Sequence, residues 1–64
     1  MVKEIRVSLG LSQAEFARRY RINLATLKNW EQNRREPDAV AISYLIVIKA
    51  IPDLVAQAIT TSEE

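Results

Sequence analysis

Signals that end and begin helices recur along this 64-residue chain, at intervals that leave room only for short helices. Gly10 follows an apolar helical pattern that begins at Val2, and glycine tolerates the left-handed conformation that ends a helix. Ser12 and Glu15 then have the spacing of a capping box, which opens a second helix. The sequence shows no strand pattern, repeat or low-complexity segment, so it predicts an all-α fold.

Similar signals divide the rest of the chain. They are favoured N-caps at Asn23 and Asp38, a left-handed stop at Asn33 and a helix-opening proline at Pro52. They predict helices over 24–32, 39–50 and 52–60. The connection between the second and third helices is so short that these two helices must cross steeply.

A chain of this length makes one small domain, which we assign to residues 1–60, with a disordered tail over 61–64. Such a domain buries only about 60% of the surface of its unfolded chain, so a second copy could contribute core. The chain has no cysteine and no histidine, which removes thiolate metal sites and the commonest general base. No nucleophile–base pair is recognisable, so we expect no enzyme, no bound metal and no cofactor.

The longest apolar run, AVAISYLIVIKAI, is interrupted by Ser43 and Lys49 and is too short to span a bilayer. The N-terminal MVKEIRVSLG lacks the apolar core of a signal peptide. We therefore expect a cytoplasmic protein that does not contact a membrane.

The net charge of +1 hides an uneven distribution. Residues 1–36 hold eight Lys or Arg side chains against four Glu, and residues 37–64 hold one lysine against four acidic side chains. The two parts therefore carry +4 and −3. A single-sign cluster can be ordinary solvated surface, but this asymmetry favours a polyanion on one side of the molecule.

The run LGLSQAEFARRYRINLATLKNWEQNRREP resembles the helix-turn-helix of the Cro/repressor-type family of bacterial and phage regulators, the XRE family. The resemblance covers residues 1–59 and is densest at SQAEFA, TLKNWEQ and RREP. It implies a compact five-helix, lambda-repressor-like DNA-binding domain whose third helix enters the major groove. The ending TLKNWEQ, the basic residues and proline after it, and the two apolar helices that follow are most similar to HigA-type antitoxins.

The resemblance implies base contacts from the outer face of the third helix. Ala25, Lys28 and Asn29 match family positions that face base edges. Gln32 lies one turn further along the same stripe. Asn29 can contact adenine through both amide atoms, Lys28 can donate to guanine, and Ala25 can meet a thymine methyl. Leu24 lies at the edge of the buried stripe, so its place is either in the core or against DNA.

Phosphate contacts are implied around the same helix. Gln13 matches the family glutamine that binds a phosphate at the N-terminus of the second helix, where amide groups and the helix dipole assist. Arg34 and Arg35, just past the third helix, are candidates for further phosphate contacts. Arg18 and its basic neighbours are weaker candidates, because some of them must face solvent or a nearby glutamate.

Glu31 shares the inner face of the third helix with Leu27 and Trp30, and a buried carboxylate requires a partner. The family implies one in the arginine of the first helix, here Arg6, so we expect an Arg6–Glu31 ion pair. Trp30 is predicted to pack in the core rather than to stack on a nucleobase. Arg21 stands where the family usually has glycine, so either the turn differs or the chain tolerates strain.

The last two helices are too apolar for one small domain to bury on every side. One interpretation is a fully apolar core helix over residues 39–50. The interpretation that we prefer is a homodimer through helices 39–50 and 52–60. Its recognition helices would lie about one DNA turn, roughly 34 Å, apart on a palindromic operator of double-stranded DNA.

We therefore predict a sequence-specific DNA-binding transcription regulator, a repressor, which the resemblance extends to an antitoxin that binds a RelE-like toxin. One alternative is the DNA-binding fragment of a longer regulator unrelated to a toxin. Another is a protein-interaction module of the same fold without DNA binding. The presence of Gln13, Lys28 and Asn29 argues against this last alternative.

Overall fold

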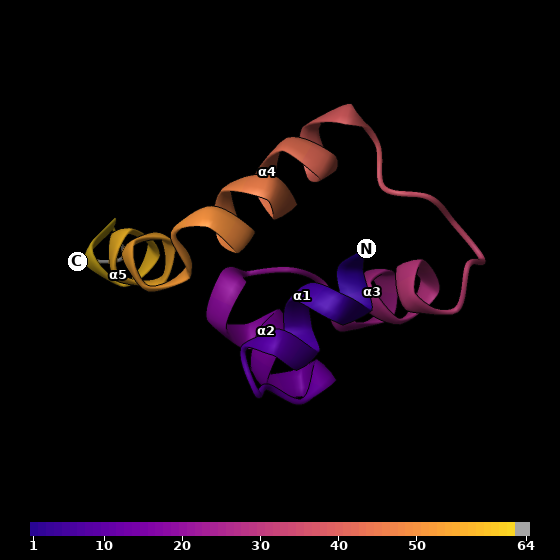
Figure 1. Cartoon of the computed structure of the whole chain (residues 1–64), viewed down its shortest axis with the longest axis horizontal. Helices are drawn as coiled ribbons and strands as arrows, with labels where there is room; N and C mark the ends of the chain where they lie inside the picture. The colour runs from indigo at the N-terminus through magenta and orange to yellow at the C-terminus, as the bar shows by residue number, and fades with distance from the viewer. Residues whose placement is uncertain (63–64) are drawn as a thin grey trace.

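The computed structural model describes residues 1–62, which form five α-helices and no strand (Figure 1). The helices are α1 (Val2–Ser8), α2 (Gln13–Tyr20), α3 (Leu24–Glu31), α4 (Ala39–Ala50) and α5 (Pro52–Ser62). α1, α2 and α3 cluster together, a loop leads the chain away from α3, and α4 returns over the cluster towards α5. The predicted all-α, five-helix architecture is confirmed.

The predicted caps open the helices. The Ser12 hydroxyl accepts a hydrogen bond from the Glu15 amide at 3.1 Å, and the Glu15 carboxylate accepts one from the Ser12 amide at 3.0 Å. The side chains of Asn23 and Asp38 accept amides of the first turns of α3 and α4, at 3.1 and 2.8 Å. These bonds satisfy amides that have no partner inside the helix.

Left-handed residues end the first three helical segments. Gly10 has φ 70°, Arg21 has φ 58° and Asn33 has φ 59°. The sequence left open whether the turn at Arg21 differs from that of the family or is strained, and the turn is strained. A left-handed conformation costs a residue with a Cβ about 1–2 kcal/mol. The turn therefore keeps its geometry although glycine is absent.

The disordered tail predicted over 61–64 was wrong for its first half. Thr61 and Ser62 belong to α5, and residues 63–64 lie outside the described part of the chain. No glycine or proline follows Pro52 to stop the helix, and polar side chains alone do not end one.

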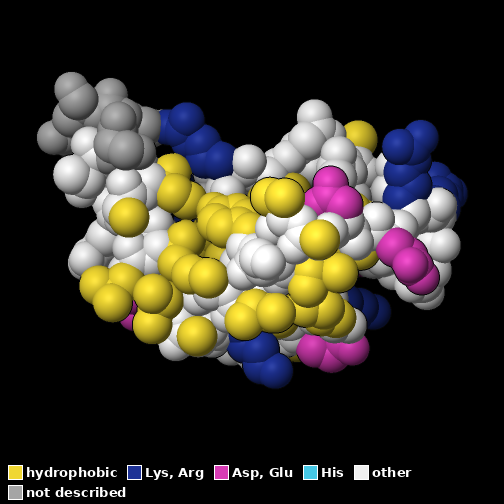
Figure 2. Space-filling view, turned by 90° about the horizontal axis from the view of Figure 1, so that it is seen from above, with side chains coloured by type: hydrophobic (Ala, Val, Ile, Leu, Met, Phe, Trp, Pro, Cys, Tyr) yellow, Lys and Arg dark blue, Asp and Glu magenta, His cyan; other side chains and the backbone are white. Residues whose placement is uncertain are grey.

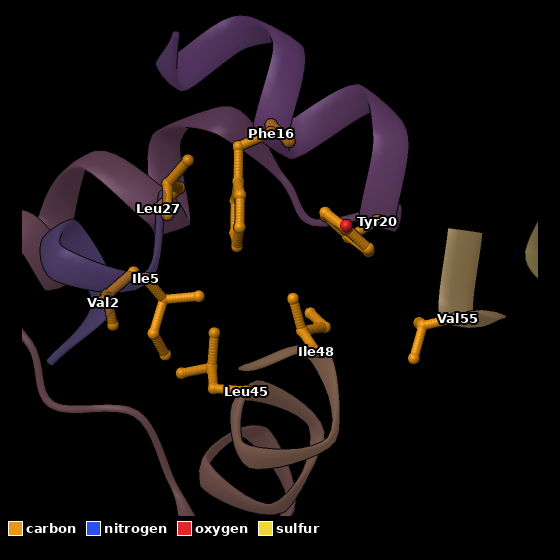
Figure 3. Packing of buried hydrophobic residues seen from close by; sticks show 9 residues of the cluster. Val2, Ile5, Phe16, Tyr20, Leu27, Leu45, Ile48 and Val55 are labelled. Carbon is orange, nitrogen blue, oxygen red and sulfur yellow. The ribbon is translucent and has the colours of Figure 1, made fainter. Parts of the chain in front are cut away.

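The hydrophobic core draws on all five helices (Figure 3). Its buried members are Val2, Ile5, Phe16, Ala17, Tyr20, Leu27, Leu45, Ile48 and Val55. The Tyr20 carbonyl accepts a hydrogen bond from the Tyr44 hydroxyl at 2.6 Å, and the Tyr20 hydroxyl donates to the Pro52 carbonyl at 3.1 Å. These two bonds fix the end of α2 against both α4 and the start of α5.

α4 buries only one of its faces. Leu45 and Ile48 are fully buried, whereas Ile46 is 54% exposed. The exposed apolar side chains of this helix and of the chain that follows it are Val40, Ile42, Ile46, Val47, Ile51 and Leu54. Hydrophobic side chains gather over the face where α4 and α5 lie (Figure 2). The alternative of a fully apolar core helix over residues 39–50 was therefore wrong.

Within the described residues, no single helix is long and apolar enough to cross a membrane. Among the helices that the structure describes, only α4 and α5 taken together reach the length and composition of a span, and they are bent by 112° at the break between them.

Candidate nucleic-acid interface

α3 turns its apolar side to the core and its polar stripe to solvent. Leu27 is fully buried, and Trp30 packs partly buried against the core, as predicted. On the opposite side Ala25, Lys28 and Gln32 are exposed and Asn29 is half-buried. The side chains predicted to contact bases therefore lie together on one accessible face.

The structure settles the two ends of this face. Leu24 is 36% exposed and lies outside the buried cluster, so the core alternative for this residue is wrong. The predicted helix 24–32 is one residue too long, because α3 ends at Glu31 and Gln32 is its cap. The Gln32 amide still donates to the Lys28 carbonyl at 3.0 Å, so this residue continues the helical path.

The tight turn before α3 depends on Arg21. In its left-handed conformation the Arg21 amide donates to the Ala17 carbonyl. The next amide, of Ile22, donates to the same carbonyl at 2.9 Å, and the Ile22 side chain packs against the core. The end of α2 and the start of α3 are thereby held together.

A partly buried ion pair fixes α3 to α1. Arg6 Nε donates to Glu31 Oε2 and Arg6 Nη2 donates to Glu31 Oε1, both at 2.8 Å. Arg6 Nη1 donates to the Leu11 carbonyl at 2.9 Å, which adds the connection between α1 and α2. The Glu31 side chain is only 4% exposed and that of Arg6 14%. The expected Arg6–Glu31 pair is thus present.

Gln13 makes a contact that the sequence analysis missed. Its Nε2 donates to Glu31 Oε1 at 3.3 Å, which joins the start of α2 to the end of α3. A side-chain amide carries two hydrogens, so this contact leaves one for a phosphate. No local pattern relates residues 18 positions apart, and only the crossing of the two helices brings them together.

The same network keeps Glu31 ionised. The hydrogen bonds from Arg6 lower the pKa of the Glu31 carboxyl, burial opposes them, and the bond from Gln13 lowers the pKa further. The bond to Glu31 raises the pKa of the Arg6 guanidinium in turn. Both charges are therefore present at neutral pH, and the pair persists.

The arginines predicted to contact phosphates are all exposed, and they are Arg18, Arg34 and Arg35. The Arg34 amide donates to the Asn29 carbonyl at 2.9 Å, which holds the loop against the end of α3. Arg19 differs from these side chains, because its guanidinium pairs with Asp53 of α5 at 3.1 Å. Its charge is thus directed towards α5 and away from α3.

Two comparisons with known proteins agree with this geometry. A family model described as helix-turn-helix matches residues 2–43. Among solved structures, the chain is similar to a helix-turn-helix XRE-family-like protein from Agrobacterium tumefaciens, with 48% identity and a TM-score of 0.90 over 91% of this chain and 94% of that one. The chain belongs to the XRE family of helix-turn-helix proteins. A search of curated proteins finds no match.

The part of the chain that matches the helix-turn-helix family holds α1, α2, α3 and the start of α4. It therefore contains the polar face of α3, the Arg6–Glu31 pair and the exposed arginines. Membership of the XRE family indicates a DNA-binding transcription regulator.

Proposed function

We propose that this XRE-family protein is a sequence-specific transcriptional repressor that binds a palindromic DNA operator as a homodimer. The polar face of α3 carries the proposal. Leu27 holds the inner side of this helix in the core, and the Arg6–Glu31 pair fixes its end. A helix held in this way can enter a major groove, which is about 12 Å wide, without rearranging.

Base contacts would come from the exposed face of α3. The Asn29 amide fits the N6 and N7 edge of adenine, and the Lys28 ammonium fits the O6 and N7 acceptors of guanine. Ala25 and Leu24 offer apolar surface to a thymine methyl. Gln32 would meet a base or a phosphate at the far end of the same stripe.

Phosphate contacts would flank this face. Arg34 and Arg35 extend it beyond α3, and Arg18 lies on α2. Gln13 would donate its second amide hydrogen to a phosphate at the start of α2, where helix amides also point. Because these contacts carry no sequence information, they would fix the register of α3 on any duplex.

The homodimer would form through the exposed apolar surface of α4 and α5. One recognition helix reads only a short half-site, and two half-sites bound together give a repressor its affinity. The exposed Ile46 supports this part of the proposal, because a large apolar side chain at the centre of an outward helix face is typical of an interface.

The test is binding of fluorescent duplexes, one covering the upstream region of the gene and one scrambled, across a series of salt concentrations. Asn29→Ala should remove about 1–3 kcal/mol of preference for the native duplex per half-site. Arg34→Ala should weaken both duplexes and reduce the slope of log K against log salt by about 0.9 for each phosphate that it leaves without a cation.

The matched control is Arg19→Gln, which removes the same charge from a side chain that pairs with Asp53. It should leave both the preference and the salt slope unchanged. If neither duplex binds, or if Asn29→Ala leaves the preference intact, the assignment of α3 is wrong. The protein-interaction alternative would then explain the exposed surfaces better.

The role of an antitoxin stays a prediction from the resemblance to HigA-type proteins. Its test is co-expression with the product of the neighbouring open reading frame. A growth defect caused by that product and relieved by this chain would support the role. If the neighbouring product is harmless, the alternative of a regulator unrelated to a toxin would be favoured.

A further inference from the structure

We infer that two copies of this chain pair through antiparallel α4 helices, about a twofold axis that passes between Ser43 and Ile46. The inference rests on the proposed homodimer and specifies how it is built. It also names the side chains that determine the direction of pairing.

The outer face of α4 has the spacing of a helix-packing seam. Ala39, Ser43, Ile46 and Ala50 follow one another at intervals of four, three and four residues, and all four are exposed. This is the heptad spacing by which one helix packs along another. The seam lies opposite the side of α4 that buries Leu45 and Ile48 in the monomer core.

The seam can be buried at little cost. Its one polar side chain, Ser43, donates its hydroxyl to the Ala39 carbonyl at 3.0 Å, so its donor is already satisfied within the helix. The small side chains let a second helix come close, at the usual interaxial distance of about 8–10 Å. Ile46 is then the large side chain that fills the contact.

The charges beside the seam favour a second copy over an unrelated partner. Asp38 and Lys49 lie at opposite ends of α4, and a separation of about three helical turns places them on the same side of it. Among the described residues neither is in an ion pair. Asp38 caps the Ala41 amide with Oδ1 at 2.8 Å, which leaves Oδ2 able to accept from another donor.

An antiparallel twofold pairing brings Asp38 of each copy beside the partner's Lys49, and it does so twice. A parallel pairing would instead place the charged flanks of the two helices on opposite sides of the seam, where Asp38 and the partner's Lys49 cannot meet. It would also align the two helix dipoles unfavourably. A second copy in the antiparallel direction therefore matches the charges at both ends of the seam.

The apolar surface continues beyond the seam. Val47 lies on the flank opposite to Lys49, and Ile51 and Leu54 extend the exposed apolar surface to α5. A stable interface commonly buries about 800 Å² on each partner, and a helix of 12 residues is about 18 Å long. The seam thus needs this extension, which the start of α5 supplies.

The first test uses Ile46→Glu, with Val7→Glu as the matched control. Val7, on α1, is 58% exposed against 54% for Ile46, so neither substitution places a carboxylate in the monomer core. Sedimentation without DNA should show that wild type and Val7→Glu are dimers of equal stability. Ile46→Glu should raise the dissociation constant of the dimer roughly 100-fold or more.

The second test determines the direction of pairing. Because the chain contains no cysteine, only the introduced cysteines can form disulfides. Chains with Ser43→Cys and chains with Ile46→Cys, one of them lengthened by a tag, are mixed and oxidised. The antiparallel seam places residue 43 opposite the partner's residue 46, so disulfides should join unlike chains. A parallel seam would join like chains.

Three results would overturn the inference, namely a monomeric wild-type chain, an Ile46→Glu variant that still dimerises, or a predominance of disulfides between like chains. Binding of Ile46→Glu to a single half-site, with and without Asn29→Ala, is measured in parallel. A retained effect of Asn29→Ala shows that α3 reads DNA even where the α4 seam is refuted. The two proposals can therefore fail separately.

Discussion

Replacing Arg6 with methionine should destabilise the whole domain, although the site predicted to contact DNA would keep all its side chains. Methionine preserves much of the length of the arginine stem but removes both hydrogen bonds to the Glu31 carboxylate. It also removes the bond to the Leu11 carbonyl. The carboxylate would then be a charge, 4% exposed, with only the longer bond from Gln13 left.

The expected loss follows from the burial of the pair. Removing one partner of a buried ion pair costs about 3–5 kcal/mol. The lower end applies here, about 3 kcal/mol, because Arg6 is 14% exposed and water can reach the vacated site. A domain of this size has a free energy of unfolding of about 3–10 kcal/mol. Arg6→Met should therefore lower Tm by roughly 12–24 °C.

The assay is urea and thermal unfolding followed by circular dichroism and by the fluorescence of Trp30, the single tryptophan. A double-mutant cycle with Glu31→Leu isolates the pair, since Arg6→Met/Glu31→Leu leaves no unpaired charge. The double variant should recover a large part of the loss. A loss below about 1 kcal/mol for Arg6→Met, or simple additivity in the cycle, would refute the role of the pair.

Three further predictions concern local features. The pKa of the Glu31 carboxyl is lower in the folded chain than its ordinary value of 4.5, so the unfolded chain takes up that proton first as the pH falls. The stability that the pair contributes should be full above that value and should be lost as the pH falls through the lowered pKa. Lowering the pH to about 3 should therefore reduce the free energy of unfolding more in wild type than in Arg6→Met/Glu31→Leu. Gly10→Ala should destabilise the domain by about 1 kcal/mol through its φ of 70° alone, because an added Cβ meets nothing within 4 Å. Arg21→Gly should stabilise it by about 0.5–1 kcal/mol, because glycine adopts the left-handed conformation without strain. Thermal unfolding measures both changes. Asp38→Ala should lower the free energy of unfolding by about 1 kcal/mol, because it removes the cap of α4. Asp38→Asn should lower it less, because asparagine also caps a helix. Equal losses in urea titrations would show that the charge of Asp38 matters rather than its cap.

The start and end of most helices could be predicted because their signals are local. Ser12, Asn23 and Asp38 each satisfy an amide three residues ahead, so the sequence alone determines the contact. The left-handed stops at Gly10 and Asn33 depend on one backbone conformation each. Where a local stop was lacking, as at the end of α5, the prediction was wrong.

Other features could not be predicted because they depend on how helices cross. The bond from Gln13 to Glu31 needs the packing of α2 against α3, which no spacing encodes. α4 is apolar on nearly every side, so its sequence does not tell which face is buried. Packing decides that Ile48 faces the core and Ile46 faces outward. The contacts predicted with DNA stay predictions.

The division between Ile48 and Ile46 separates the two tasks of α4 in the proposed dimer. Ile48 belongs to the same buried cluster as Leu27 of α3, and so helps to hold α3 at its angle. Ile46, two residues earlier, would set the position of the partner's α3 along the DNA. Since one rigid helix of 12 residues carries both faces, the angle of each recognition helix and the spacing between the two are coupled. The spacing of half-sites that the dimer can bind would therefore depend on the packing of α4.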